Sequence, residues 1–334
     1  MLRRILCFYA CLALALVASL APTRAQTGGP FILDGPAPAF AFDVNAAGRI
    51  AGSIAVPDGN AHAVLWRNPD AAPGELLLLP GTNWSRAFAV NARGQIAGQL
   101  QDRSVVPVAA FAAYWDGEGE SPVALASGTL AVAINSAGQV AGNMRAGTSV
   151  HAAVWDDPWG DPQDLGTFGG ASSGAADLND GEQIVGMASY ADGSQRAAFW
   201  PSASETPVDL GTLDGATPSA AAAINERGEI VGEAFFAAGS RRVALIWADA
   251  GAAPISLMSL GGASSQAVGI DNRGRIVGQA QNAGGEMRAV LWPGALEPPI
   301  DLGPGFARAV NARGLVVGDS GGQAVAWAVT GRGP

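Results

Sequence analysis

Lysine is absent from this sequence, and all 19 basic residues are arginines. They are outnumbered by 29 acidic residues, which gives a formal net charge of −10. Nucleic acids and anionic lipid surfaces bind proteins through clusters of positive charge, so this balance argues against both as partners. An acidic surface is also ordinary for a soluble secreted protein, and the charge by itself identifies no partner.

Cysteine occurs only at Cys7 and Cys11. Both lie in an N-terminal segment with two arginines near its start, an apolar run over 5–21 and a small residue, Ala25, at its end. This order is typical of a secretory signal peptide (1–25) cleaved after Ala25. An uncleaved N-terminal anchor is the alternative. Cleavage after Ala25 would leave the mature chain without thiols, disulfides or cysteine metal ligands.

This signal peptide predicts that residues 26–334 are secreted, to the periplasm or the extracellular medium. No later segment is apolar enough to span a membrane, so we expect no membrane insertion of the mature chain. Histidine occurs only as His62 and His151, each four residues before a tryptophan. Recurrence at one position favours a structural role over a catalytic one. An acidic stretch at 177–181 lacks the spacing of a calcium loop, so the sequence predicts no metal and no cofactor.

What the sequence does contain is an eight-residue phrase that occurs seven times. The copies are Asn45–Gly52, Asn91–Gly98, Asn135–Gly142, Asn179–Gly186, Asn225–Gly232, Asp271–Gly278 and Asn311–Gly318. Their closing glycines lie 46, 44, 44, 46, 46 and 40 residues apart. Each copy is followed by a tryptophan: Trp66, Trp115, Trp155, Trp200, Trp247, Trp292 and Trp327. A period of this length indicates one supersecondary unit copied in tandem.

Each repeat carries the signals of four short strands. An alanine stands four residues before the first residue of every phrase, which predicts a crowded innermost strand. The Asn-x-x-Gly start of the phrase predicts a tight turn with glycine in the left-handed position. A third strand ends in the tryptophan. A fourth follows nine residues later, as at Asp164–Gly166.

Four antiparallel strands per repeat, without helical periodicity, predict an all-β fold: a seven-bladed β-propeller. A parallel β-helix would need a shorter repeat. The seventh repeat has no fourth strand before Pro334, whereas residues 31–35 form an unpaired strand before the first phrase. We expect this N-terminal strand to pair with the last blade, which closes the ring and leaves no exposed sheet edge. Residues 26–334 then form a single domain.

These motifs resemble those of the HAF-repeat proteins, a family of probable extracellular repeat proteins. Ala221–Gly232, His62–Trp66 and Asp164–Gly170 match its three motifs, which recur in order over 31–334. The resemblance implies a secreted repeat protein and assigns no activity. Tryptophan–aspartate repeats would explain only the Trp-Asp pairs at 115–116 and 155–156, and the fixed tyrosine of kelch repeats has no counterpart here.

In a propeller, the loops between strands two and three of each blade lie on one face. The loops that lead from strand four to strand one of the next blade lie on the same face. The sequence varies most there, and aromatic and arginine side chains are frequent contact residues. The candidate contact residues on this face are Trp84, Arg86, Tyr190, Arg196, Phe235, Phe236, Arg241, Met287 and Arg288. This pattern favours a non-enzymatic scaffold that binds a protein or a polysaccharide through face loops.

Two other hypotheses stay open. Asp43 and Asp177 interrupt the small residues of the expected inner strands in blades one and four. A pair of carboxylates near the central axis would suit a hydrolase or lyase acting on extracellular glycans. A purely structural envelope component is the third hypothesis, and oligomerisation without a ligand would support it.

Overall fold

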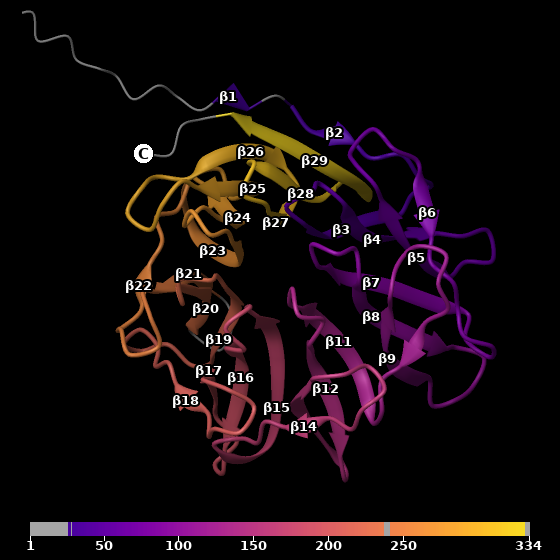
Figure 1. Cartoon of the computed structure of the whole chain (residues 1–334). Helices are drawn as coiled ribbons and strands as arrows, with labels where there is room; N and C mark the ends of the chain where they lie inside the picture. The colour runs from indigo at the N-terminus through magenta and orange to yellow at the C-terminus, as the bar shows by residue number, and fades with distance from the viewer. Residues whose placement is uncertain (1–25, 28, 237–240, 331–334) are drawn as a thin grey trace, which may run out of the picture.

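The computed structural model describes residues 26–27, 29–236 and 241–330. The predicted signal peptide, with Cys7 and Cys11, lies outside the described residues. The described chain forms 29 strands, grouped into seven antiparallel sheets around a central channel (Figure 1). The seven-bladed propeller predicted from the sequence is confirmed. No helix in these ranges is long and apolar enough to cross a membrane.

Each of the first six blades is a four-stranded antiparallel sheet built from consecutive strands. The innermost strands are β3 (Ala39–Val44), β7 (Trp84–Val90), β11 (Gly128–Ile134), β15 (Gly169–Leu178), β19 (Ser219–Ile224), β23 (Gly261–Ile270) and, in blade seven, β27 (Phe306–Val310). The second strands are β4 (Ile50–Ala55), β8 (Ile96–Asp102), β12 (Val140–Ala146), β16 (Ile184–Tyr190), β20 (Ile230–Phe236), β24 (Ile276–Asn282) and β28 (Leu315–Ser320).

The third strands, which end in the tryptophan or run just past it, are β5 (Ala61–Trp66), β9 (Ala109–Trp115), β13 (Ser149–Trp155), β17 (Gln195–Trp200), β21 (Arg241–Trp247), β25 (Met287–Trp292) and β29 (Gln323–Thr330). The short outer strands are β6 (Pro73–Glu75), β10 (Val123–Ala124), β14 (Gln163–Asp164), β18 (Val208–Asp209), β22 (Ile255–Ser256) and β26 (Ile300–Pro304).

The N-terminal segment supplies the outer strand of blade seven. Strand β2 (Phe31–Ile32) pairs antiparallel with β29, and β1 (Gln26–Thr27) pairs with the far end of the same strand. The next residue, Leu33, is only 1% exposed and donates its backbone N–H to the carbonyl of Ala324. The predicted closure is therefore confirmed.

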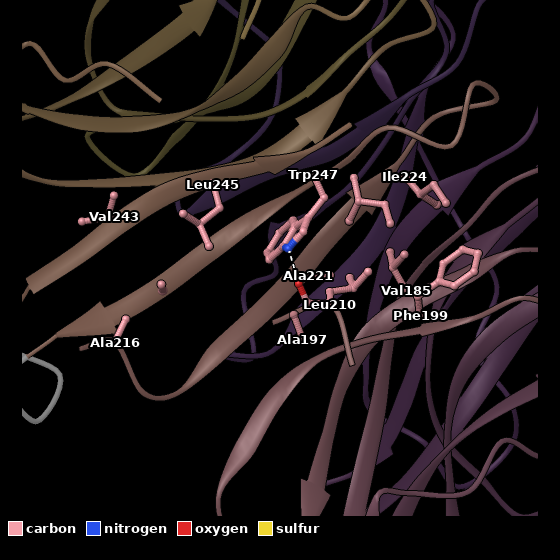
Figure 2. Packing of buried hydrophobic residues seen from close by; sticks show 12 residues of the cluster. Val185, Ala197, Phe199, Leu210, Ala216, Ala221, Ile224, Val243, Leu245 and Trp247 are labelled. Carbon is pink, nitrogen blue, oxygen red and sulfur yellow. Dashed lines mark hydrogen bonds between the residues drawn. The ribbon is translucent and has the colours of Figure 1, made fainter. Parts of the chain in front are cut away.

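The seven repeated tryptophans are fully buried and tie each blade to the one before it. Figure 2 shows Trp247, whose Nε1 donates to the carbonyl of Leu210 at 2.7 Å while its ring packs in a cluster with Val185 and Phe199 of blade four. In blade one, Trp66 donates to the carbonyl of Asp34, in the segment that completes blade seven. The same contact therefore occurs at the ring closure.

The first residue of each phrase builds a ring of hydrogen bonds around the channel. In blade one, Asn45 accepts from the N–H groups of Ala47 and Arg49 within its own turn, and its Nδ2 donates to the carbonyl of Asn91 at 2.8 Å. The same donation continues from Asn91 to Asn135, Asn135 to Asn179, Asn179 to Asn225, Asn225 to Asp271 and Asn311 to Asn45. The turn residues thus hold neighbouring blades together as well as reversing the chain.

The closing glycine of each phrase opposes a β-bulge in the innermost strand. Gly52 pairs with Ala41 and Ala51 with Asp43, so Phe42 is left unpaired. A Cβ on any of the seven closing glycines would lie 1.9–2.1 Å from a carbonyl oxygen of the innermost strand. Only glycine fits this position. The bulged residues, such as Phe42, line the channel.

One turn differs from the sequence prediction. In blade four the phrase begins Asn179-Asp-Gly-Glu182, so its glycine comes one residue early. Glu182, with φ 63°, occupies the left-handed position that a glycine holds in each of the other six turns. The prediction of glycine at this position is wrong for blade four, because the hydrogen bonds of Asn179 set the turn geometry whatever residue follows.

Candidate ligand-binding site at the channel mouth

The innermost strands enclose a central cavity of about 460 Å³. The side chains that line it stand one, two, three or five residues before the first residue of a phrase. The residue four positions before each phrase is the repeated alanine, which is buried in the blade and does not line the cavity. Most of the lining side chains are apolar, and the polar ones are Asp43, Asp177, Gln266 and Arg308. A volume of this size is in the range of small-molecule sites.

The two halves of the channel wall differ in residue size. Blades seven, one and two line the cavity with Phe306, Arg308, Phe42 and Phe88, and Phe40 and Arg86 stand next to these residues toward the loop-connected ends of the innermost strands. The equivalent positions of blades three to six hold smaller residues, among them Val132, Ala176, Ala222 and Val268. A ligand in the channel would therefore meet a bulky cationic wall and an opposite wall of small apolar residues.

Arg86 lies at the centre of the bulky wall. It is the third residue of β7, close to the face that carries the connections between strands two and three, which we call the loop face. Its guanidinium carbon is 4.8 Å from the ring centroid of Trp84 and 5.8 Å from those of Phe40 and Phe42. These distances are those of cation–π contacts. Three rings from two blades thus surround one arginine.

Two further arginines extend this arrangement. Arg103, just after β8, lies 4.3 Å from the Trp84 ring centroid. Arg308, on β27, lies 5.3 Å from that of Phe42 and 4.5 Å from that of Phe306. We call the whole set the arginine–aromatic cluster: Phe40, Phe42, Trp84, Arg86, Arg103, Phe306 and Arg308.

The charges of this cluster are unevenly paired. Arg308 donates to the carboxylate of Asp319 at 2.7 Å, and Arg103 donates to the neutral amide of Gln101. Among the described residues, the guanidinium of Arg86 has neither a hydrogen-bond acceptor nor an ion-pair partner, and its Nε is buried. Desolvation lowers the pKa of Arg86, and the charges of Arg103 and Arg308 lower it further. The cluster is therefore a local excess of positive charge on an acidic protein.

The two channel aspartates connect blades. Asp43 accepts from the N–H groups of Val44 at 2.7 Å and of Val90, in the next blade, at 2.8 Å. Asp177 accepts in the same way from Leu178 and from Ile224 of blade five. Desolvation raises the pKa of Asp43, and it raises the pKa of Asp177 to about 7. Both carboxylates thus serve as links between neighbouring innermost strands.

The two histidines pair with acids of the outer strands. His62 Nδ1 lies 3.1 Å from the carboxylate of Glu75, and His151 Nδ1 lies 2.9 Å from that of Asp164. Arg288 holds the same position in blade six and pairs with Asp301 at 3.1 Å. The histidines therefore link strands three and four, and they do not contact the channel lining. No group of three or more potential metal ligands occurs among the described residues.

The residues predicted for the contact face all border the loop face, but they lie in strands and do not form one patch. Trp84 and Arg86 begin β7, and Trp84 is buried. The others sit farther out along the blades, each in its own local contact. Tyr190 stacks on Phe168, Phe235 lies under Arg242, Phe236 lies under Arg241, Arg288 pairs with Asp301, and Arg196 donates to the carbonyl of Gln195.

Sequence reasoning identified Trp84 but missed the other partners of Arg86. Phe40 and Phe42 stand five and three residues before Asn45, and Phe306 and Arg308 stand five and three residues before Asn311. Aligning the repeats on the phrase would have shown aromatic or arginine residues at these two positions only in blades seven, one and two. That contrast was the available signal.

No protein-family model matches the sequence, and no curated protein matches it either. Solved structures do match the fold. The β-propeller domain of the Trilobed protease from Pyrococcus furiosus is 11% identical, with 92% of this chain and 94% of that chain covered and a TM-score of 0.55. YCF48 bound to D1 peptide is 14% identical, with 94% and 99% covered and a TM-score of 0.54.

The BP39L lectin from Burkholderia pseudomallei is also 14% identical, with 89% of this chain and 97% of that chain covered and a TM-score of 0.50. At these identities the likeness shows a shared β-propeller fold and nothing about activity.

Proposed function

We propose that this protein is a secreted, non-enzymatic scaffold that binds a protein or polysaccharide ligand on its loop face, around the mouth of the channel. The observation that carries the proposal is the arginine–aromatic cluster. Three arginines and four aromatic rings from blades seven, one and two meet at one end of a cavity of about 460 Å³. Such side chains dominate binding energy where proteins contact ligands.

Other features fit this proposal. The apolar tip between β8 and β9 stands beside the cluster, and its Val106 is 97% exposed. The likeness to solved propellers that include a lectin and a peptide complex is compatible with binding. The predicted signal peptide and the resemblance to HAF-repeat proteins support a role outside the cytoplasm.

A glycan hydrolase or lyase is the second candidate, because the pKa of Asp177 is raised to about 7, where a carboxyl group can act as an acid or a base. Both oxygens of Asp177, like both oxygens of Asp43, already accept backbone hydrogen bonds. These contacts favour the structural role. Unchanged turnover in a D43N/D177N variant, for any activity found, would dismiss the catalytic pair.

The binding proposal is tested by comparing the two faces of the ring. The purified protein is screened against glycan and envelope-protein panels, and each hit is measured with two matched variants. R103E/V106D changes the loop face, and L296D/R313E makes the same charge change on the opposite face, which carries the Asn-x-x-Gly turns (the turn face). All four residues are exposed.

We expect R103E/V106D to weaken binding at least about tenfold and L296D/R313E to leave it unchanged, since charge reversal at a contact costs more than 1 kcal/mol. Binding that is lost only in L296D/R313E would place the ligand on the turn face and refute the proposal.

A further inference from the structure

Arg86 differs from Arg103 and Arg308 in the hydrogen bonding of its guanidinium. Its Nε atom is buried, and the guanidinium has no acceptor among the described residues. A desolvated guanidinium normally has a carboxylate or several carbonyl oxygens as partners, because leaving its N–H groups unpaired is unfavourable. In the same cluster Arg308 has such a partner in Asp319. The difference marks Arg86 as the arginine available to a ligand.

The aromatic rings around Arg86 hold the guanidinium in one place. Trp84 and Phe40 belong to the loop-face ends of β7 and β3, and Phe42 stands between Arg86 and Arg308. A guanidinium held by ring faces keeps its N–H edge free for two parallel hydrogen bonds, which matches the geometry of a carboxylate. The positive charges of Arg103 and Arg308 add to the attraction of an anion at this point.

The remainder of the cavity is suited to an apolar group. The wall opposite the cluster consists mostly of small apolar side chains, including Val132, Ala222 and Val268, and its polar members are Asp177 and Gln266. Few polar groups on that wall could replace the hydrogen bonds that a hydroxyl-rich sugar ring makes with water. An apolar body would lose no such bonds on entry.

We infer that the channel mouth binds a carboxylate carried on an apolar body, with the carboxylate on Arg86 and the apolar body against the small-residue wall. This inference rests on the proposed binding function and specifies the ligand class of the same site. The carboxylate can belong to a free small acid or to the C-terminal residue of a peptide, because the recognised chemistry is the same.

The position of the channel aspartates agrees with this orientation. Asp43 and Asp177 stand two residues before a phrase, nearer the turn face than Arg86, which stands five residues before one. Their oxygens are occupied by backbone N–H groups of the neighbouring blades. A ligand carboxylate thus finds the N–H donors of Arg86 at the mouth and no donor from these aspartates deeper in the channel, which fixes its orientation.

Calorimetric titration of the purified protein with three probes tests the inference. The probes are 3-phenylpropionate, an alanine-rich pentapeptide ending in phenylalanine with a free carboxylate, and the same peptide ending in a carboxamide. Each is measured against the unaltered protein, R86Q and a control, R313Q. Arg313 lies exposed on the turn face, where its backbone N–H donates to Asn311 in its own turn.

We expect the free-acid peptide or phenylpropionate to bind and the carboxamide to bind at least about tenfold more weakly, since the carboxamide cannot accept two charge-assisted hydrogen bonds from the guanidinium. R86Q should abolish that difference and R313Q should preserve it. Binding of phenylpropionate alone identifies a small acid as the source, and tighter binding of the peptide identifies a C-terminus.

Equal binding of acid and carboxamide, or no effect of R86Q on a correctly folded protein, overturns the carboxylate inference while leaving the scaffold proposal intact. Absence of binding by every probe also overturns it. The carboxamide comparison uses unaltered protein, so it decides the question even if R86Q does not fold. Failure of the scaffold proposal would be seen in a different experiment: a ligand found in the glycan or envelope-protein panels would lose binding only to L296D/R313E.

Discussion

The guanidinium of Arg275 pairs with the carboxylate of Asp271 at 2.5 Å and also donates to the carbonyl of Asn311 at 2.8 Å. In the other six blades the amide of an asparagine makes this donation to the next blade. Aspartate has no N–H group to donate, so Arg275 replaces the missing donor and neutralises the carboxylate. The hydrogen-bond ring therefore stays closed in the one blade that lacks the asparagine.

Replacing Arg275 with glutamine should lower the free energy of unfolding by about 3 kcal/mol, because it leaves the nearly buried Asp271 without its cation. The double variant D271N/R275Q should recover most of that loss. It recreates the asparagine–glutamine pair of blade two, where Asn91 Nδ2 donates both to Gln95 and to the next blade. Urea unfolding of both variants is the measurement. Equal losses in both would contradict this role of the pair.

Leu33→Ala should cost about 3 kcal/mol of unfolding free energy, because Leu33 is 1% exposed and packs in the core that closes the ring. Its neighbour Ile32 lies in β2 but is 61% exposed. Ile32→Ala is the matched control and should change stability by less than about 0.5 kcal/mol. If the two variants unfold at the same urea concentration, the N-terminal segment does not close the ring in solution.

Glu182→Gly should stabilise the protein by roughly 0.5 kcal/mol. A residue with a side chain pays about 1 kcal/mol in the left-handed region, and the greater flexibility of glycine in the unfolded chain offsets part of the gain. Glu182→Ala keeps the unfavourable φ of 63° and should give no comparable gain. Thermal unfolding of the two variants side by side separates the backbone effect from loss of the exposed carboxylate.

The stability of the protein should fall as the pH rises from about 4 through about 7. Desolvation is the main cause that raises the pKa of Asp177 to about 7, and the charges of Asp43 and Glu226 raise it further. The unfolded chain has an ordinary aspartate pKa of about 3.9, so between these values the folded protein binds the proton more tightly. The stabilisation is complete below about pH 4 and is lost as Asp177 ionises, by at most about 1.4 kcal/mol per pH unit.

D177N should flatten this dependence, because asparagine does not titrate and its Oδ1 still accepts one of the two backbone N–H groups. Urea unfolding at pH 5, 6, 7 and 8 gives the stability difference between the unaltered protein and D177N. That difference should shift in favour of D177N as the pH increases. A difference independent of pH would show that Asp177 is ionised throughout. Asp43, whose pKa is also raised, should leave a residual slope in D177N.

Local pattern was sufficient to predict most of the fold. Every blade makes the same contacts through three residues at fixed places in the repeat. These residues are the alanine before the phrase, the glycine that closes it and the tryptophan that follows. The number of blades and their closure by residues 31–35 follow from the count of these copies. The exceptions, Glu182 and the pair Asp271 and Arg275, are places where one copy departs from the pattern and nearby hydrogen bonds keep the geometry.

The candidate binding site was predictable only in part. Trp84 and Arg86 were identified from the sequence, but Tyr190, Phe235 and Arg288 were grouped with them although they lie in separate local contacts. Residue type shows what a side chain can contact. It does not show how far out along a blade that side chain stands.

The repeating unit, its four strands and the number of copies can be read from the sequence, because each is encoded over a few dozen neighbouring residues. The meeting of Phe306 and Arg308 with Phe42 and Arg86 at one end of the channel is visible only in the folded ring. These residues are brought together when the ring closes and the bulges turn the inner side chains toward the axis. That proximity depends on the curvature of all seven blades, which no single repeat contains.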